Sequence, residues 1–207
     1  MSVDHILVTF GYFAVFFIVG LESGGIPLPG ETVLAAAAVS AATTGRLEIW
    51  LVFLAATAGA IIGDNIGYWI GYRGGYKLAR KYGHKIRLDE RKLKVGRYVF
   101  ARHGGKVVFL GRFVSVLRTF AAFIAGTVRM SWPKFLVYNA TGGIVWAGAV
   151  TFGFYLAGNT LKRLSGTVNI ILIVLAVAVV VGVFLVVRRQ TELLADKAEA
   201  AYPGPLE

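Results

Sequence analysis

Three long apolar stretches dominate the sequence, at residues 50–72, 135–157 and 170–187. A helix needs about 20 mostly apolar residues to cross the hydrocarbon core of a bilayer, and each stretch approaches or exceeds that length. Hydrophobic residues make up 57% of the chain and charged residues only 16%, which excludes a soluble globular fold. We therefore predict an all-α membrane protein with membrane-spanning helices over residues 47–72, 133–158 and 168–187.

The net charge of +11 is concentrated in one segment between two of these stretches. Residues 73–106 hold twelve of the 22 basic side chains and only two acids, Asp89 and Glu90. A basic segment between apolar spans is typical of a cytoplasmic loop, where it contacts anionic membrane lipids. No nucleic-acid-binding motif accompanies the charge, so we expect no nucleic-acid partner. We expect residues 73–105 and the C-terminus to be cytoplasmic, with an amphipathic helix over residues 88–102 lying on the membrane or recruiting a partner protein.

Two further apolar regions are interrupted. The first runs from residue 6 to 44, and two prolines and three glycines between Glu22 and Glu31 exclude a continuous helix there. The second runs from residue 106 to 129 and is interrupted over residues 112–118. Short apolar arms around a break are typical of a re-entrant hairpin, because irregular backbone at membrane depth must be buried in protein or line a wet cavity. A plain exposed loop between two spans is the alternative for the first region.

A weak internal repeat relates the two halves of the chain. An offset of 87 positions aligns Tyr68 with Tyr155, Gly71 with Gly158, and Glu31 with Arg118. Each half then has the same layout of broken hairpin, short polar turn and full span. Because one span and the basic loop separate the hairpins, they would enter the membrane from opposite faces. We therefore predict an inverted repeat, an arrangement that many transporters use to build a midplane binding site.

Five ionisable residues interrupt the apolar regions, and each is costly there, by about 2.5–3.5 kcal/mol on insertion scales. They are Glu22, Glu31, Asp64, Arg112 and Arg118. One interpretation is structural, with acids and arginines pairing to hold the hairpins together. For Asp64, a capping or helix–helix hydrogen-bonding role is as well supported as a role in transport.

A functional interpretation of the same residues is a phosphate site. Glu31 follows Pro29 and Gly30 at the start of a helix, where the helix dipole favours a carboxylate. Arg118 also opens a helical arm, where a cation is unfavourable unless an anion lies beside it. Two guanidinium groups, Arg112 and Arg118, suit one phosphate. Carboxylates that take up protons could couple proton movement to its release.

Several motifs in this order resemble the DedA family of membrane proteins, also called SNARE-associated or VTT-domain proteins. They are the two acids of Glu22-SGGIPLPG-Glu31, GDNIGYWIGYRGG from Gly63, GRFVSVLRTFAAFIAG from Gly111, and RMSWPKFLVYNATGGIVWAG from Arg129. The resemblance covers roughly residues 10–160. The second hairpin departs from the family pattern, because Ser115 and Val116 stand where Pro-Gly is usual. That turn must be broken by other means or be more helical.

The resemblance implies a single DedA/VTT domain over residues 1–190, followed by a cytoplasmic tail at 191–207, in the bacterial cytoplasmic (inner) membrane. It implies translocation of undecaprenyl phosphate, coupled to protons. The implied transport and proton-coupling residues are Glu22 and Glu31, to which we add Asp64, and the implied phosphate-binding residues are Arg112 and Arg118. We expect support of the hairpin turns from five further residues: Gly25, Pro27, Pro29, Gly30 and Ser115.

Other functions stay open on the sequence alone. The same fold could carry a phospholipid such as phosphatidylethanolamine, as a flippase or scramblase, or export a small solute with protons. A structural or partner-binding role, with possible homo-oligomers, is a further alternative. Catalysis on a lipid phosphate would call for a nucleophilic His or an acid cluster holding metal. His5, His84 and His103 lie at an end or in the basic segment, so we expect no enzyme activity, cofactor or metal.

Overall fold

The structure is a computed structural model that describes residues 3–26, 28–82, 90–113, 115–163 and 201. Within these ranges, all regular secondary structure is helical, which agrees with the predicted all-α class. The helices are α1 (Val3–Ser23), α2 (Gly30–Thr44), α3 (Ile49–Tyr82), α4 (Glu90–His103), α5 (Lys106–Gly111), α6 (Ser115–Thr127) and α7 (Trp132–Arg163). The expected last span at 168–187 lies outside the described residues, as does the tail at 191–207 apart from residue 201.

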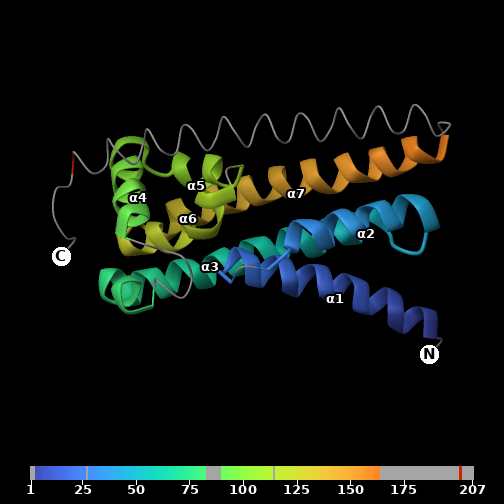
Figure 1. The fold of residues 1–207 in the computed structure, drawn as a ribbon, viewed down its shortest axis with the longest axis horizontal. Helices are drawn as coiled ribbons and strands as arrows, with labels where there is room; N and C mark the ends of the chain where they lie inside the picture. Colours follow the sequence, from blue (N-terminus) through green and yellow to red (C-terminus); the bar gives the residue numbers. More distant parts are fainter. Residues whose placement is uncertain (1–2, 27, 83–89, 114, 164–200, 202–207) are drawn as a thin grey trace.

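Among the described residues, two helices are long and apolar enough to cross a membrane, α3 over Ile49–Gly75 and α7 over Trp132–Thr160. Both run along the long axis of the molecule (Figure 1). Most residues of their apolar stretches are not buried inside the protein, unlike those of a core helix in a soluble fold. The backbone of α3 is kinked at Gly75, where φ is 53°, and the helix then continues into the basic segment as far as Tyr82. The expected span at 47–72 therefore corresponds to only the first part of a longer helix.

A sharp turn separates α1 from α2 at the predicted interruption. The N–H of Ile26 donates to the Leu21 carbonyl at 3.0 Å and that of Gly25 to the Glu22 carbonyl at 3.1 Å. These bonds end α1 in the motif that needs a left-handed residue, and Gly25 supplies it with φ 104°. The two helices contact each other, and the turn between them lies near the middle of the long axis (Figure 1).

The second interruption is shorter than the predicted 112–118. Helix α5 ends at Gly111 and α6 already begins at Ser115. Arg112 keeps helical dihedral angles, φ −63° and ψ −25°. Without the Pro-Gly pair that is usual in the family, nothing at positions 115 and 116 prevents helix formation. The second turn is therefore the more helical of the two alternatives considered above, and Arg118 lies inside α6.

Helix α4 covers most of the expected amphipathic segment, and its apolar face contacts other helices of the protein. Val95 and Phe100 are buried, and α4 contacts both α5 and α6. At Gly96, a Cβ atom would collide with the side chain of Ile124 on α6. The apolar face of α4 therefore packs on the protein, whereas the sequence predicted a helix that lies on the membrane or recruits a partner protein.

Glycines on α3 allow the backbones of α1 and α6 to lie close to the backbone of α3. A Cβ atom at Gly59 would collide with the Phe16 carbonyl of α1, and one at Gly63 with the Gly20 carbonyl. Further along, a Cβ at Gly71 would collide with the Phe123 carbonyl of α6. Small residues at intervals of four permit such close backbone contact between helices. Helix α3 thus packs on α1 up to the middle of the molecule and on α6 further toward the α4 end (Figure 1).

Candidate functional site

The turn between α1 and α2 holds two acids close together. Glu22 lies in the last turn of α1 and Glu31 in the first turn of α2, as expected from Pro29 and Gly30. Gly30 has a steric role, because a Cβ atom there would collide with the Glu22 carboxylate. Pro29 is the residue that precedes α2, with φ −83°. Pro27 and the side chain of Ser115 lie outside the described parts of the structure.

Arg118 of α6 bridges the two acids. Its Nη2 donates to Glu22 Oε1 at 2.8 Å, and its Nη1 donates to Glu31 Oε1. The Arg118 side chain is 7% exposed and that of Glu22 15%, whereas that of Glu31 is 55% exposed. The guanidinium carbon also lies 5.1 Å from the ring centre of Trp146 on α7. These contacts join the turn between α1 and α2 to the start of α6. The sequence suggested that the acids and arginines pair, but it did not show which residues do so.

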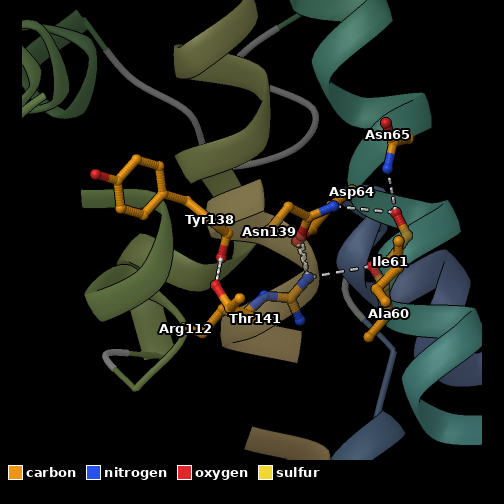
Figure 2. Close-up of polar contacts among 8 residues, drawn as sticks. All are labelled: Ala60, Ile61, Asp64, Asn65, Arg112, Tyr138, Asn139 and Thr141. Carbon is orange, nitrogen blue, oxygen red and sulfur yellow. Dashed lines mark hydrogen bonds and ion pairs between the residues drawn. The ribbon is translucent and has the colours of Figure 1, made fainter. Parts of the chain in front are cut away.

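Arg112 forms a separate buried network (Figure 2). Its Nη2 donates to Asp64 Oδ2, to Asn139 Oδ1, and to the Ala60 carbonyl at 3.3 Å. Asn139 in turn donates from Nδ2 to the Ile61 carbonyl at 3.2 Å. All three side chains are buried. The network therefore ties the α5 end to α3 and α7, and Asp64 contacts Arg112 directly.

The Arg112 network is incompletely satisfied. Asp64 Oδ1 and Arg112 Nε are buried and have no hydrogen-bond partner among the described residues. A buried charged group normally uses its full hydrogen-bonding capacity, because leaving it unpaired is costly. The pair therefore retains one acceptor and one donor that a proton, water or ligand group could engage.

One cavity borders both charged groups. It has a volume of about 540 Å³ and is lined by Glu31, Arg112 and Trp146. Further lining residues are apolar, and most come from α7: Phe113, Ala149, Val150, Gly153, Phe154 and Ala157. The two arginines do not meet as a free pair of cations, since each is bonded to different carboxylates. Arg112 lines this cavity directly, whereas Arg118 is connected to it through its contacts with Glu31 and Trp146, which do line it.

Sequence reasoning missed two members of the site. Asn139 accepts from Arg112, and Trp146 stacks on Arg118. The signal for Asn139 was present, because it is a polar residue within a span of otherwise apolar character. Trp146 carried no signal, since an aromatic residue in an apolar span is usual. Asn65, the neighbour of Asp64, donates from Nδ2 to the same Ile61 carbonyl at 2.8 Å (Figure 2) and accepts a hydrogen bond from Trp132 Nε1 at 3.0 Å.

Comparison with known proteins decides the family. The family model described as the VTT domain matches residues 28–156. The chain belongs to the DedA family of VTT-domain membrane proteins. A protein named DedA from Escherichia coli is 30% identical over 86% of this chain and 83% of its own length. The two spans and both ion-pair groups of this DedA-family protein lie within or next to the matched region.

Relatives from other bacteria extend the comparison. An uncharacterized membrane protein of Synechocystis is 41% identical over 71% of this chain and 67% of its own length. One from Mycobacterium tuberculosis is 37% identical over 92% of this chain and 89% of its own length. No solved structure matches the chain. The relatives establish a membrane protein, and the chemistry of the site must be argued from its own residues.

Proposed function

We propose that this protein translocates a lipid phosphate across the membrane, with undecaprenyl phosphate as the substrate that the family resemblance favours. The observation that carries the proposal is the cavity bordered by Glu31, Arg112 and Trp146. Its guanidinium, Arg112, can bind an anionic headgroup, and its apolar side along α7 suits a hydrocarbon chain. The lipid is moved unchanged, so the protein acts as a transporter and not as an enzyme.

In this proposal, the two helix pairs, α1 with α2 and α5 with α6, are re-entrant hairpins that enter the membrane from opposite faces. Helix α2 has 15 residues and α6 has 13, so neither reaches the roughly 30 Å of the hydrocarbon core. The contacts also repeat, since α1 packs on α2 and α3 as α5 packs on α6 and α7. Between the two halves, the contact of α3 with α6 corresponds to the contact of α7 with α2. This correspondence supports an inverted repeat.

Charge balance supports coupling to protons. The acids Glu22, Glu31 and Asp64 outnumber Arg112 and Arg118, which leaves one net negative charge on the site when all are ionised. A phosphate adds at least one more negative charge in a region of low dielectric constant. Its entry is therefore favoured when a carboxylate takes up a proton and leaves its arginine. Glu31 is the first candidate, because it is the most exposed acid and lines the cavity.

The orientation follows from the charge at one end of the molecule. The basic segment begins at Arg73, beside the end of the apolar part of α3, and continues through α4. Excess Lys and Arg mark the cytoplasmic side of a membrane protein. We therefore place the α4 end in the cytoplasm and the α2–α3 turn on the opposite side of the inner membrane.

A second candidate substrate is a zwitterionic phospholipid such as phosphatidylethanolamine. The cavity presents a carboxylate, Glu31, together with a guanidinium, Arg112, so it could bind an ammonium and a phosphate at once. The two candidates differ in the headgroup that should compete for transport.

The test uses the purified full chain in vesicles with a fluorescent polyprenyl phosphate whose outer-leaflet fraction is quenched by an impermeant reductant. We expect Arg118→Lys to slow translocation at least tenfold, since lysine cannot bridge two partners as a fork. Arg46→Lys, an exposed cation in the α2–α3 turn, is the matched control. Wild-type rates in Arg118→Lys would refute the proposal, and competition by phosphatidylethanolamine but not by polyprenyl phosphate would select the second candidate. Release of inorganic phosphate would show an enzyme.

A further inference from the structure

A second and larger cavity lies at the α4 end of the molecule, apart from the site above. Its volume is about 790 Å³, and it opens between the C-terminal half of α4 and the turn from α6 to α7. Three cations from three segments line it: Arg97 of α4, Arg129 of the turn and Lys134 of α7. None of the described residues that line it is acidic. Phe100 and Val128 give the cavity an apolar part.

The backbone at Arg129 is unusual. Arg129 is the only non-glycine residue with positive φ, 54°, among those described. Its N–H donates to the Gly126 carbonyl at 2.9 Å, and the N–H of Met130 donates to the Ala125 carbonyl at 3.0 Å. This hydrogen-bond pattern ends a helix with a left-handed residue, and glycine is by far the favoured residue there.

An arginine at this position therefore opposes the local backbone preference. A strained non-glycine residue is a reason to ask what its side chain supplies. Here the guanidinium lies 5.5 Å from the ring centre of Tyr72, and Arg129 and Lys134 both line the cavity. The side chain contributes a cation to the cavity, which glycine could not.

The depth of the cavity matches the polar boundary of a membrane. The apolar part of α3 ends at Gly75 and that of α7 begins at Trp132, both toward the α4 end (Figure 1). The cavity is lined by Met130, Ser131 and Lys134 at the start of α7. Phosphate groups of lipids lie at this depth, and guanidinium and ammonium groups are their usual protein partners.

The geometry points to a phosphate-binding site formed by Arg97, Arg129 and Lys134 at the membrane boundary, distinct from the central site and independent of the transport proposal. The ligand is the phosphate of an anionic lipid headgroup or a free phosphate, since both present the same oxygens to the three cations. The cavity is open, and its lining among the described residues includes no acid, so it can admit either.

The test compares two glycine variants of the full chain in phosphatidylcholine nanodiscs. Arg129→Gly removes the guanidinium while supplying the residue that the backbone prefers, so it should unfold at the same temperature as the wild type or higher. Arg46→Gly removes an exposed cation from a turn at the other end of the molecule and is the matched control. Association of spin-labelled phosphatidylglycerol relative to spin-labelled phosphatidylcholine measures the lipid arm, and the effect of inorganic phosphate on the unfolding temperature measures the free-phosphate arm.

We expect the wild type to prefer phosphatidylglycerol, and Arg129→Gly to lower that preference about fivefold while Arg46→Gly leaves it unchanged. If there is no lipid preference but inorganic phosphate stabilises the wild type and not Arg129→Gly, the site stands and its ligand is free phosphate. A folded Arg129→Gly protein that keeps the wild-type response in both arms overturns the site, as does a wild type that responds in neither. Lys134→Gln, in the exposed first turn of α7, gives the same comparison should Arg129→Gly fail to fold.

Discussion

Glu31 and Arg118 form an ion pair and lie 87 positions apart, which is the offset that aligns the two halves of the sequence. Equivalent positions of an inverted repeat can touch each other only near its twofold axis. The acid of one half therefore meets the base of the other at the centre of the proposed symmetry. The first prediction below tests that arrangement.

Cysteine labelling should place the end of α2 and the start of α7 on opposite sides of the membrane. The chain has no native cysteine, so single substitutions can be labelled cleanly. We expect Thr44→Cys and Ser131→Cys to react with an impermeant maleimide from opposite faces of oriented vesicles, since α2 ends at one end of the molecule and α7 begins at the other. Ile26→Cys, at the turn between α1 and α2, should react slowly from both faces. Rapid labelling of Ile26→Cys from the face opposite to Thr44→Cys would instead mean that α1 and α2 both cross the membrane.

Breaking the Arg112 network should be strongly destabilising. Arg112→Ala leaves Asp64 as a buried, unpaired charge, and such changes cost about 3–5 kcal/mol of unfolding free energy. The double variant Arg112→Leu with Asp64→Leu removes both charges and should recover much of that loss. Chemical unfolding in mild detergent measures the difference. Equal destabilisation by the single and double variants would contradict the assignment of the cost to an unpaired charge.

Removing the charge of Glu31 should strengthen phosphate binding. The Glu31 carboxylate competes for Arg118, so the neutral amide of Glu31→Gln leaves more of the guanidinium available to a phosphate. We expect Glu31→Gln to bind polyprenyl phosphate more tightly than the wild type, and equilibrium binding of the lipid measures the difference. Glu48→Gln, an exposed acid near the start of α3, is the control and should keep the wild-type affinity. An unchanged affinity in Glu31→Gln would show that Glu31 does not compete for Arg118.

Trp146 should stabilise Arg118 through its ring. Cation–π contacts contribute about 0.5–2 kcal/mol, with the larger values where the pair is shielded from water. We expect a double-mutant cycle of Trp146→Leu and Arg118→Gln to give a coupling in that range. Unfolding free energies of the two single variants and the double variant supply the measurement. Additive effects would show that the ring and the guanidinium act independently.

Close helix packing gives a prediction with an internal control. Gly63→Ala should destabilise the protein by about 1–3 kcal/mol, because its Cβ would meet the Gly20 backbone. Gly153→Ala has open space around the new methyl group and should be neutral or up to about 1 kcal/mol stabilising through helix propensity. Thermal unfolding of both variants under the same conditions separates packing from propensity. A neutral Gly63→Ala would show that α1 and α3 can separate at little cost.

Much of the architecture was predictable because it depends on local composition. Apolar runs of sufficient length predict the spans, and Pro27, Pro29 and the neighbouring glycines predict the break after Glu22. The second break was predicted too long, since its boundary depends on whether Ser115 begins a helix, and Ser115 does so in α6. The apolar face of α4 could not be assigned to lipid or to protein from its own sequence, because both surfaces are apolar.

The sequence by itself determined that this is a helical membrane protein of the DedA family with costly charges at its helix breaks. Only the tertiary structure decided which charges meet. Arg118 pairs with Glu22 and Glu31, whereas Arg112 pairs with Asp64 and Asn139 on two other helices. The reason is physical, because each partner comes from a different helix and is positioned by the packing of those helices on one another. These partners are 27 to 96 positions apart and are brought within hydrogen-bonding distance only when those helices are in place.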